Sequence, residues 1–262
     1  MDSNDKWGYI DKSGKYVIDP QFDYVYKFAD NGFAAVRTGD SENGPGKYGY
    51  IDKTGAYVIN PQFEDAFNFS NGLACVESGG KWGYIDKTGK YVINPQFTSA
   101  DTFGEYGLAC VRIGGWGEEG KYRYIDKKGK YIINPQYENA YNFTSNGLAR
   151  VEAKDGGFDG YSYTTQMGYI DKTGKYVINP QFDLAYDFTD NGFACVQVND
   201  MYGYIDKTGK IVINPQFDIA LDFYDDGYTW VKVGDKWGII DEKGNYVVNP
   251  QFKNNIDSYY MY

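Results

Sequence analysis

Hydrophobic and polar positions recur along this chain in one short pattern. From Lys81 to Phe97 the sequence reads KWGYIDKTGKYVINPQF, in which large side chains alternate with small or polar ones on both sides of a Lys-Thr-Gly turn. Alternation with a period of two, interrupted by a glycine-containing turn, predicts a β-hairpin. Close copies of this stretch occur seven times, so the chain is a tandem repeat.

An aspartate precedes each turn and marks the register of the repeat. Successive marks are 41, 34, 40, 45, 35 and 35 residues apart, which sets a base unit of about 35 residues. An Asp at this place can accept hydrogen bonds from backbone N–H groups further on, and the following Gly supplies a positive φ. We interpret these aspartates as turn caps rather than as a ring of cation ligands or acid–base groups. They are Asp11, Asp52, Asp86, Asp126, Asp171, Asp206 and Asp241.

Two further elements are expected after each hairpin. The Asn-Pro step, as at Asn94-Pro95, should end the second strand, because proline cannot donate a hydrogen bond to a ladder. Residues 63–69 place apolar side chains on one face and are short enough for a third strand. Residues 73–77, after an Asn-Gly turn, are apolar on both faces. Each unit is thus predicted to supply four short strands.

Four strands in each unit, apolar on both faces, are typical of a blade that packs between two neighbours in a β-propeller. Burial of one large apolar side chain contributes roughly 1.5 to 3 kcal/mol, so a unit gains much by stacking and little alone. We expect one all-β repeat domain with seven blades, closed if residues beyond Phe252 supply inner strands to the blade whose outer hairpin is residues 6–22. The alternative is an open β-solenoid. The domain is 1–262, with repeats at about 6–46, 47–80, 81–120, 121–165, 166–200, 201–235 and 236–262.

Variation in length is confined to one place in the repeat. From the turn aspartate to the valine of the fourth strand the spacing is 25 residues in five repeats and 24 in one. From that valine to the next aspartate it is 10 in three repeats, but 16, 15 and 20 after Val36, Val111 and Val151. Insertions at one structural position of a repeat protein project from one face, which is often the binding face.

The three insertions combine glycine, acidic residues and aromatic rings. Tyr and Trp anchor many protein interfaces, and four rings lie where the repeat requires none. Two further residues replace the small residue of the fourth strand in single repeats. Acidic side chains in the insertions could offer oxygen ligands to calcium, but they match no known loop spacing, and we interpret them as solvated surface. The candidate binding residues are Trp116, Phe158, Tyr161, Tyr163, Arg150 and Trp230.

The composition limits the catalytic and binding chemistry that the side chains can support. The chain contains no histidine, which removes the commonest general base and metal ligand. We therefore expect no catalytic residues, no metal and no cofactor. A formal charge of −10, from 36 acidic against 26 basic residues, opposes binding to nucleic acid. Apolar runs stay well below the ~20 residues of a membrane helix, so no membrane insertion is expected.

Three cysteines occupy the same repeat position in different copies, at Cys75, Cys110 and Cys195. An odd number at sites that the repeat holds apart does not indicate a disulfide framework, and we interpret each as a small buried hydrophobe. Residues 1–5 lack the basic and apolar regions of a signal peptide. Both observations slightly favour the cytoplasm for a soluble chain as given. A surface or secreted location is expected if it is a fragment of a longer protein.

The recurring motif resembles that of a known family. KWGYID at residues 6–11 and 81–86, KWGIID at 236–241, and the downstream Gly-Leu-Ala-x-Val, as at 72–76, are similar to the bacterial WG repeat proteins. The resemblance covers nearly the whole chain and implies an interaction-mediating module. The hairpin also looks like the blades of quinoprotein-type propellers. Substitutions in the motif suggest loose packing requirements; they are Tyr48, Tyr122, Met167 and Tyr202 for Trp, and Arg123 for Gly.

We predict a non-enzymatic scaffold that binds another protein through the inserted loops on one face. The alternative is a carbohydrate-binding module that uses the same rings, since such rings also stack on sugars. An enzyme related to quinoprotein propellers is a third alternative. It is disfavoured because a cofactor site needs residues that break the repeat, and few polar residues do so.

Overall fold

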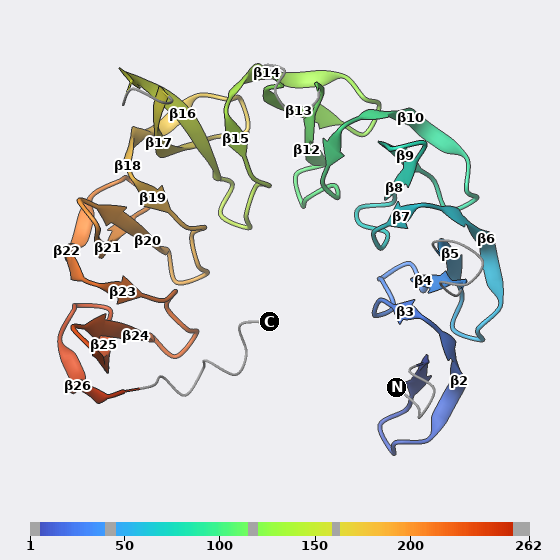
Figure 1. The fold of residues 1–262 in the computed structure, drawn as a ribbon, viewed down its shortest axis with the longest axis horizontal. Coiled ribbons are helices and arrows are strands. Elements are labelled where there is room, and N and C mark those ends of the chain that lie inside the picture. The colour runs from blue at the N-terminus through green and yellow to red at the C-terminus, as the bar shows by residue number, and fades with distance from the viewer. Residues whose placement is uncertain (1–5, 40–45, 115–119, 159–162, 254–262) are drawn as a thin grey trace. The chain divides into compact units, whose positions relative to one another are not determined.

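The structure, a computed structural model, describes residues 6–39, 46–114, 120–158 and 163–253 (Figure 1). For residues 135–136, 155–158 and 163–164 it describes the backbone alone. Within these ranges the chain forms strands and turns and no helix, and hence no helix that could cross a membrane. The chain divides into two compact units, residues 1–135 and 136–262.

The first unit begins with a two-stranded hairpin, which is followed by antiparallel sheets of four strands in chain order. Each of these sheets has a two-residue inner strand, two central strands and a seven-residue outer strand. The last strand, β14, extends two residues into the second unit. The strands are β1 (Trp7–Ile10), β2 (Tyr16–Phe22), β3 (Tyr24–Val25), β4 (Ala34–Thr38), β5 (Lys47–Ile51), β6 (Tyr57–Phe63), β7 (Asp65–Ala66), β8 (Ala74–Ser78), β9 (Lys81–Ile85), β10 (Tyr91–Phe97), β11 (Ser99–Ala100), β12 (Leu108–Arg112), β13 (Tyr122–Asp126) and β14 (Tyr131–Tyr137).

The second unit repeats the same plan in three antiparallel sheets of four strands. Its central pair β16 and β17 is longer than the equivalent pairs elsewhere (Figure 1). The strands are β15 (Asn139–Ala140), β16 (Ala149–Phe158), β17 (Tyr163–Ile170), β18 (Tyr176–Phe182), β19 (Leu184–Ala185), β20 (Phe193–Val198), β21 (Met201–Asp206), β22 (Ile211–Phe217), β23 (Ile219–Ala220), β24 (Tyr228–Val233), β25 (Lys236–Asp241) and β26 (Tyr246–Phe252).

Each sheet combines parts of two consecutive sequence repeats. The inner strand β7 and the central strand β8 come from one repeat, whereas β9 and β10 are the hairpin of the next. The hairpin predicted from the motif is confirmed, and it forms the outer half of a sheet. Consecutive antiparallel strands within one sheet are the construction of a propeller blade, whereas a β-solenoid pairs strands from successive turns.

The turn aspartates cap their turns as predicted. Asp86 Oδ1 accepts hydrogen bonds from Thr88 N at 2.8 Å, Thr88 Oγ1 at 2.6 Å and Lys90 N at 3.2 Å. Gly89 supplies the positive φ, at 85°. These hydrogen bonds favour the ionised carboxylate and lower the pKa of Asp86. The same backbone contacts recur at the other six turns.

Two expectations about strand ends are wrong. The second strand of the hairpin continues through Pro95 to Phe97, because β10 is the outer edge of its sheet and its ladder with β9 is already bulged there. The third strand is only the two residues of β7, because the chain then leaves the sheet. Beyond it, Asn68 Oδ1 accepts a hydrogen bond from Ala35 N of the neighbouring β3–β6 sheet at 2.9 Å.

The glycine of the WG motif is required by a close backbone approach. A Cβ at Gly83 would lie 2.7 Å from Ile93 O and 2.7 Å from Pro95 N, where β10 bulges over β9. Five other glycines at this position meet the same obstacle. The expectation of loose packing is therefore wrong for this glycine. Where Arg123 replaces it, the guanidinium lies 4.8 Å from the ring centroid of Tyr131.

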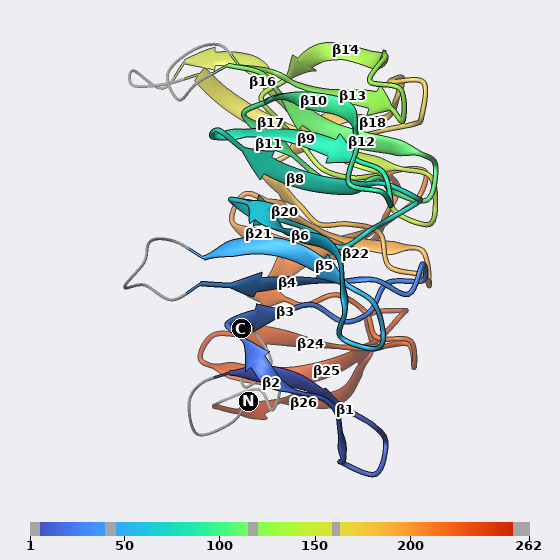
Figure 2. The ribbon, with the colours of Figure 1, turned by 90° about the vertical axis from the view of Figure 1, so that its right-hand side faces the viewer.

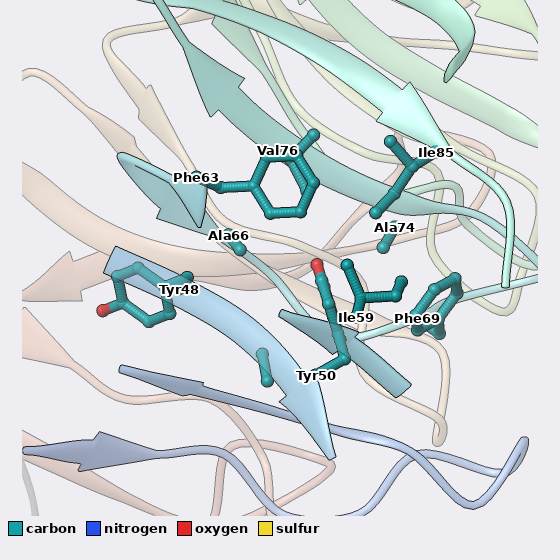
Figure 3. Close-up of a cluster of buried hydrophobic side chains, with 10 residues drawn as sticks. Tyr48, Tyr50, Ile59, Phe63, Ala66, Phe69, Ala74, Val76 and Ile85 are labelled. Carbon is teal, nitrogen blue, oxygen red and sulfur yellow. The ribbon is translucent and has the colours of Figure 1, made fainter. Parts of the chain in front are cut away.

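The hydrophobic core lies between neighbouring sheets rather than within one (Figure 3). In the first unit one cluster joins Tyr48, Tyr50 and Phe63 of the β3–β6 sheet to Val76 and Ile85 of the β7–β10 sheet. Each large apolar side chain buried here contributes roughly 1.5 to 3 kcal/mol. Neighbouring sheets therefore stabilise each other.

A buried tyrosine of the hairpin fixes each of these interfaces. Tyr84, on β9, is fully buried, and its hydroxyl donates to the backbone oxygen of Asp101, just after β11 of the next sheet, at 2.7 Å. A buried hydroxyl needs such a partner, because an unpaired one costs about 1 to 3 kcal/mol. Equivalent bonds run from Tyr9 to Tyr26, Tyr50 to Phe67, Tyr169 to Tyr186 and Tyr204 to Leu221, at 2.6 to 2.8 Å.

We predict that Tyr84→Phe lowers the free energy of unfolding by about 1 to 2 kcal/mol, because the oxygen of Asp101 loses its buried donor. Denaturant titration of the purified chain measures the change. The control is Tyr57→Phe. The ring of Tyr57 is 39% exposed on an outer strand, so this change should lower the free energy of unfolding by no more than about 0.5 kcal/mol. Equal losses in the two variants would contradict the role given to the hydroxyl.

We also predict that Gly83→Ala is destabilising by about 2 kcal/mol or more, because the added Cβ must displace the backbone of β10. Thermal and denaturant unfolding report the effect. Lys81→Ala, at an exposed position of the same strand, serves as the matched control and should change stability little. An unaltered midpoint for Gly83→Ala would show that β10 can move away without cost.

Candidate functional site

One residue of the fourth strand, the residue directly before the recurring valine, faces the next sheet. We call it the cysteine position, since it holds Cys75, Cys110 and Cys195. Cys75 Sγ lies 3.6 Å from the backbone oxygen of Ala100, and Cys195 Sγ lies 3.7 Å from that of Ala220. In each case the acceptor belongs to the inner strand of the following sheet. The side chain at this position therefore contacts the inner edge strand of the neighbouring sheet.

The three cysteines are unpaired and buried, which confirms the sequence interpretation. Burial away from water disfavours the thiolate and raises the pKa of all three thiols. Thiols of this kind are poor nucleophiles at neutral pH. Their contribution is packing between sheets.

Arg150 replaces cysteine at this position in β16 and extends the contact. Its Nη1 donates to the backbone oxygen of Ala185, on β19, at 2.8 Å. Its Nε lies 3.0 Å from Asp187 Oδ1, outside the angular range of a hydrogen bond, so the contact is an ion pair. The guanidinium carbon lies 3.6 Å from the ring centroid of Tyr141, which adds a cation–π contact. Arg150 thus ties the β15–β18 sheet to the β19–β22 sheet.

A second carboxyl group lies close to this ion pair. Asp187 and Asp222 occupy the same repeat position, two residues after the inner strands β19 and β23. Partial burial raises the pKa of both carboxyls, and the charge of Asp187 raises the pKa of Asp222 further. Arg150 acts in the opposite direction on both. Water still reaches these groups, since 46% of the Asp187 side-chain surface is exposed, and it limits the size of both shifts.

Asp222 also lines a cavity of about 340 Å³. Its walls are the rings of Tyr186 and Tyr202, together with Ile219, Ala220 and Leu221. Burial, and to a lesser extent Tyr202, raises the pKa of Tyr186 to about 12, so its hydroxyl stays neutral at physiological pH. The arrangement offers apolar walls with one carboxyl at the edge. Among the described residues no three His, Cys, Asp or Glu side chains are grouped so that they could hold a metal ion.

Sequence reasoning identified Arg150 but missed the two aspartates. They come from repeats other than that of Arg150, and only the packing of sheets brings them to it. One signal was present in the sequence. Acidic residues occur at this repeat position in the two consecutive repeats that follow Arg150, and again as Asp257 in the last repeat, whereas the other repeats hold Lys27, Asn68, Thr102 and Asn142.

The other candidate residues are dispersed. Trp116 and Tyr161 lie outside the described residues. Phe158 and Tyr163 pair with each other across β16 and β17, and only their backbone is described. Trp230, on β24, is only 9% exposed and lines a separate cavity of about 350 Å³ with Tyr224, Tyr228, Ile239 and Val247 among others. Arg150 and Trp230 are thus not part of one site.

The three insertions all join the central strands of a sheet. They connect β4 to β5, β12 to β13 and β16 to β17, as the spacing predicted. The third insertion lengthens its strands, with pairs Ala153↔Gln166, Lys154↔Thr165 and Phe158↔Tyr163. These pairs extend beyond the last residues that β15 and β18 contact on either side. A two-stranded ribbon therefore projects from this sheet.

We predict that Asp222→Asn raises the free energy of unfolding at pH 7 by up to about 1 kcal/mol. A carboxyl whose pKa is raised by folding destabilises the folded protein as the pH rises from its unfolded pKa of about 3.9 through its folded pKa. The stability gained by the Asn variant over the wild type should therefore vanish below about pH 4. Denaturant titrations between pH 3 and 8 measure it. Asp225→Asn, an exposed acid nearby, is the control. A gain that does not depend on pH would contradict the repulsion between Asp187 and Asp222.

Comparison with solved structures shows the fold. A crystal structure of a eukaryotic initiation factor aligns with a TM-score of 0.60 and 10% identity, covering 90% of this chain and 69% of that one. Hsv2 of Kluyvelomyces marxianus aligns at 0.49 and 12% identity, over 92% and 88% of the two chains. The β-propeller domain of the trilobed protease from Pyrococcus furiosus aligns at 0.49 and 9% identity, over 88% and 84%.

Comparison of sequences identifies the repeat. No curated protein matches the chain. The profile of the family described as WG containing repeat matches seven times, at residues 7–40, 48–82, 82–115, 122–157, 167–202, 202–237 and 237–259. The prediction of an all-β propeller built from WG repeats is confirmed. The predicted closure of the ring by the C-terminal residues concerns residues 254–262, which lie outside the described residues. A bacterial source stays a prediction. The chain belongs to the WG-containing-repeat family.

Proposed function

We propose that the chain is a non-catalytic scaffold that binds another protein through its three inserted connections. The observation that carries the proposal is that the insertions leave the pairing register of the central strands unchanged. The pairs Thr38↔Lys47 and Arg112↔Tyr122 keep the register of the short pair Ser78↔Lys81. Loops held on such a rigid frame are the usual place for binding residues.

The short connections show that the sheet does not need a long loop. Between β8 and β9 the turn is Gly79-Gly80, whose backbone N–H groups donate to the Glu64 carboxylate at 3.1 and 2.9 Å. Equivalent acids accept from the turn at Asn199 and Gly234. A tight, capped turn therefore completes the sheet without an insertion.

In sheets with an insertion the residue equivalent to Glu64 has another partner. Asp23 pairs with Lys6 at 2.6 Å, and Glu138 pairs with Lys154 at 3.6 Å. Glu64 also pairs with Lys47, the equivalent of Lys6, at 3.7 Å, so the acid beside a short turn caps that turn in addition to forming an ion pair. The inserted residues therefore enlarge the surface and are not needed to complete the sheet, as is expected of a binding loop.

The non-catalytic part of the proposal rests on the available side chains. The sequence has no histidine. Within the described ranges, the three cysteine thiols are buried with raised pKa values, and Asp187 is engaged with Arg150. Neither group is arranged as an activated nucleophile with an adjacent base.

The decisive experiment replaces each insertion by the Ser-Gly-Gly-Lys connection of residues 78–81. Partners are first captured from the native host by cross-linking and identified by mass spectrometry, and the affinity is then measured with purified components. The triple replacement should keep the unfolding temperature and weaken binding by about 100-fold or more. Replacement of Asn199-Asp200 by Gly-Gly, at a short connection, is the control and should change affinity less than about threefold.

Unchanged affinity in the triple replacement would contradict the proposal. Binding of the wild-type chain to a glycan array that is lost in the replacement would likewise contradict a protein partner.

We further predict that the aromatic residues of the loops carry most of the binding energy. The affinity for the partner should fall by about 30-fold, corresponding to about 2 kcal/mol, in each of the variants Trp116→Ala, Tyr161→Ala and Tyr163→Ala, because rings of this kind act as interface anchors. Titration calorimetry measures the affinities. Asp40→Ala, an acid of the first insertion, is the control, and equal effects at all four positions would exclude a role for the rings.

A further inference from the structure

Within the second unit, the interface between the β19–β22 and β23–β26 sheets matches the one that contains Arg150, but it lacks the arginine (Figure 2). Cys195, on β20, occupies the repeat position that Arg150 occupies on β16. Arg150 donates to the backbone oxygen of Ala185. Cys195 Sγ lies 3.7 Å from the equivalent oxygen one sheet further on, that of Ala220. The two interfaces can therefore be compared residue by residue.

Three groups hold the guanidinium of Arg150: an aromatic ring, a backbone oxygen and a carboxylate. The ring centroid lies 3.6 Å from the guanidinium carbon, the backbone oxygen 2.8 Å from Nη1 and the carboxylate oxygen 3.0 Å from Nε. All three groups recur at the second interface, where a cysteine takes the place of the arginine. The equivalent residues are Tyr186 for Tyr141, Ala220 for Ala185 and Asp222 for Asp187.

These three residues of the second interface line one cavity. It is the cavity of about 340 Å³ described above, whose remaining walls are Tyr202, Ile219 and Leu221. The cavity opens to solvent, since Tyr186 is 39% exposed and Ile219 is 38% exposed. Its volume is near the lower end of the range of about 300 to 1,000 Å³ that is usual for small-molecule sites. It can accept one long side chain or a compound of similar size.

The charges around this cavity leave one acid without a cation. Arg150 forms its ion pair with Asp187, and among the described residues no ion pair involves Asp222. Burial and the charge of Asp187 raise the pKa of Asp222, so its ionised form is disfavoured there. With both acids ionised, Arg150 balances only one of them. A ligand with one positive charge would balance the other.

The combination of a small residue at the cysteine position with an acid in the following repeat distinguishes this interface. The other small residues at the cysteine position are combined with neutral residues. In one of these cases the neutral residue is already used, since Asn68 Oδ1 accepts a hydrogen bond from Ala35 N at 2.9 Å. The other combinations are Ala35 with Asn68, Cys75 with Thr102 and Cys110 with Asn142.

We propose that the cavity beside Cys195 binds a guanidinium group, the group that ends an arginine side chain, from another molecule. The flat face of the guanidinium lies against the ring of Tyr186, one N–H donates to the backbone oxygen of Ala220, and the charge pairs with Asp222. A planar group with several N–H donors can make all three contacts at once, which a compact ammonium cannot. The site contains no residue of the three insertions and does not depend on the function proposed above.

Ligands that differ in charge and shape test this recognition. In titrations of the full chain at low salt, followed by NMR, Nα-acetylarginine amide should bind saturably at one site. Nα-acetylcitrulline amide has nearly the same shape without the charge and should bind at least about tenfold more weakly. Nα-acetyllysine amide keeps the charge without the planar group and should bind at least about threefold more weakly.

A peptide distinguishes the two sources of such a group. An arginine with two glycines on either side should bind more tightly than Nα-acetylarginine amide if the ligand is a side chain of a partner protein, because the flanking backbone then adds contacts. Equal affinity of the two would support a small guanidinium compound as the ligand.

Variants of the cavity locate the site. Asp222→Asn should weaken Nα-acetylarginine amide by at least about tenfold, although the same change is expected to stabilise the fold, so lost binding cannot be attributed to unfolding. The control Asp225→Asn should stay within about twofold. Tyr186→Leu should weaken binding by at least about threefold, whereas Tyr186→Phe, which keeps the ring, should stay within about twofold.

A change at the cysteine position tests the comparison with Arg150 directly. Cys195→Arg places a guanidinium of the chain itself in the cavity and should abolish binding of Nα-acetylarginine amide. Cys195→Ala keeps the position small, as Ala35 does in its own sheet, and should bind as the wild type does. Thermal unfolding confirms that each variant is folded, and if Cys195→Arg does not fold, the Asp222 and Tyr186 variants still decide the question.

The proposal is overturned if Nα-acetylarginine amide does not bind saturably to the full chain, or if it binds no better than the citrulline ligand. Unchanged affinity in Asp222→Asn would also overturn it, because binding would then occur elsewhere. The chain with all three insertions replaced should bind Nα-acetylarginine amide as well as the wild type, so the failure of this proposal and the failure of the proposed function can be told apart.

Discussion

Within each of the two units, the hydroxyl of one tyrosine ties a sheet to the sheet that follows it. It lies inside an apolar interface and must find an acceptor, and the backbone oxygen that it reaches belongs to the following sheet, as from Tyr84 to Asp101. The bond therefore fixes the separation and register of two neighbours. Because the core also lies between sheets, a single sheet has neither a buried core nor a satisfied tyrosine when it stands alone.

Local features of the fold could be predicted from the sequence because their causes are local. The Asp86 cap and the positive φ of Gly89 involve residues within one turn, and the alternation of side chains defines the hairpin around it. The burial of Cys75 could be predicted because a small residue, Cys or Ala, occupies this position in most repeats. The position of the insertions followed from spacing alone.

Other features depend on packing between repeats and could not be predicted in the same way. The sequence does not show that Tyr84 bonds to the next sheet, or that Pro95 lies within an edge strand whose bulge requires Gly83. The pairing of Arg150 with Asp187 joins residues from different sheets. The ring candidates of the loops were chosen because the repeat does not explain them, and for the same reason the repeat does not position them.

The repeat and its interruptions thus have different roles. Where the sequence is constant, its residues hold neighbouring sheets together. We propose that surface for a partner arises where the constant plan changes, at the loops that replace the short turn of Gly79-Gly80. A rigid frame with a few altered positions can acquire a binding partner without loss of its fold.

Native-state hydrogen exchange tests the mutual dependence of the sheets most directly. If neighbouring sheets stabilise each other, the central strands β4, β5, β8 and β9 should exchange with one common free energy of opening, and that value should approach the global free energy of unfolding. Separate free energies for the β3–β6 and β7–β10 sheets, each well below the global value, would contradict the account.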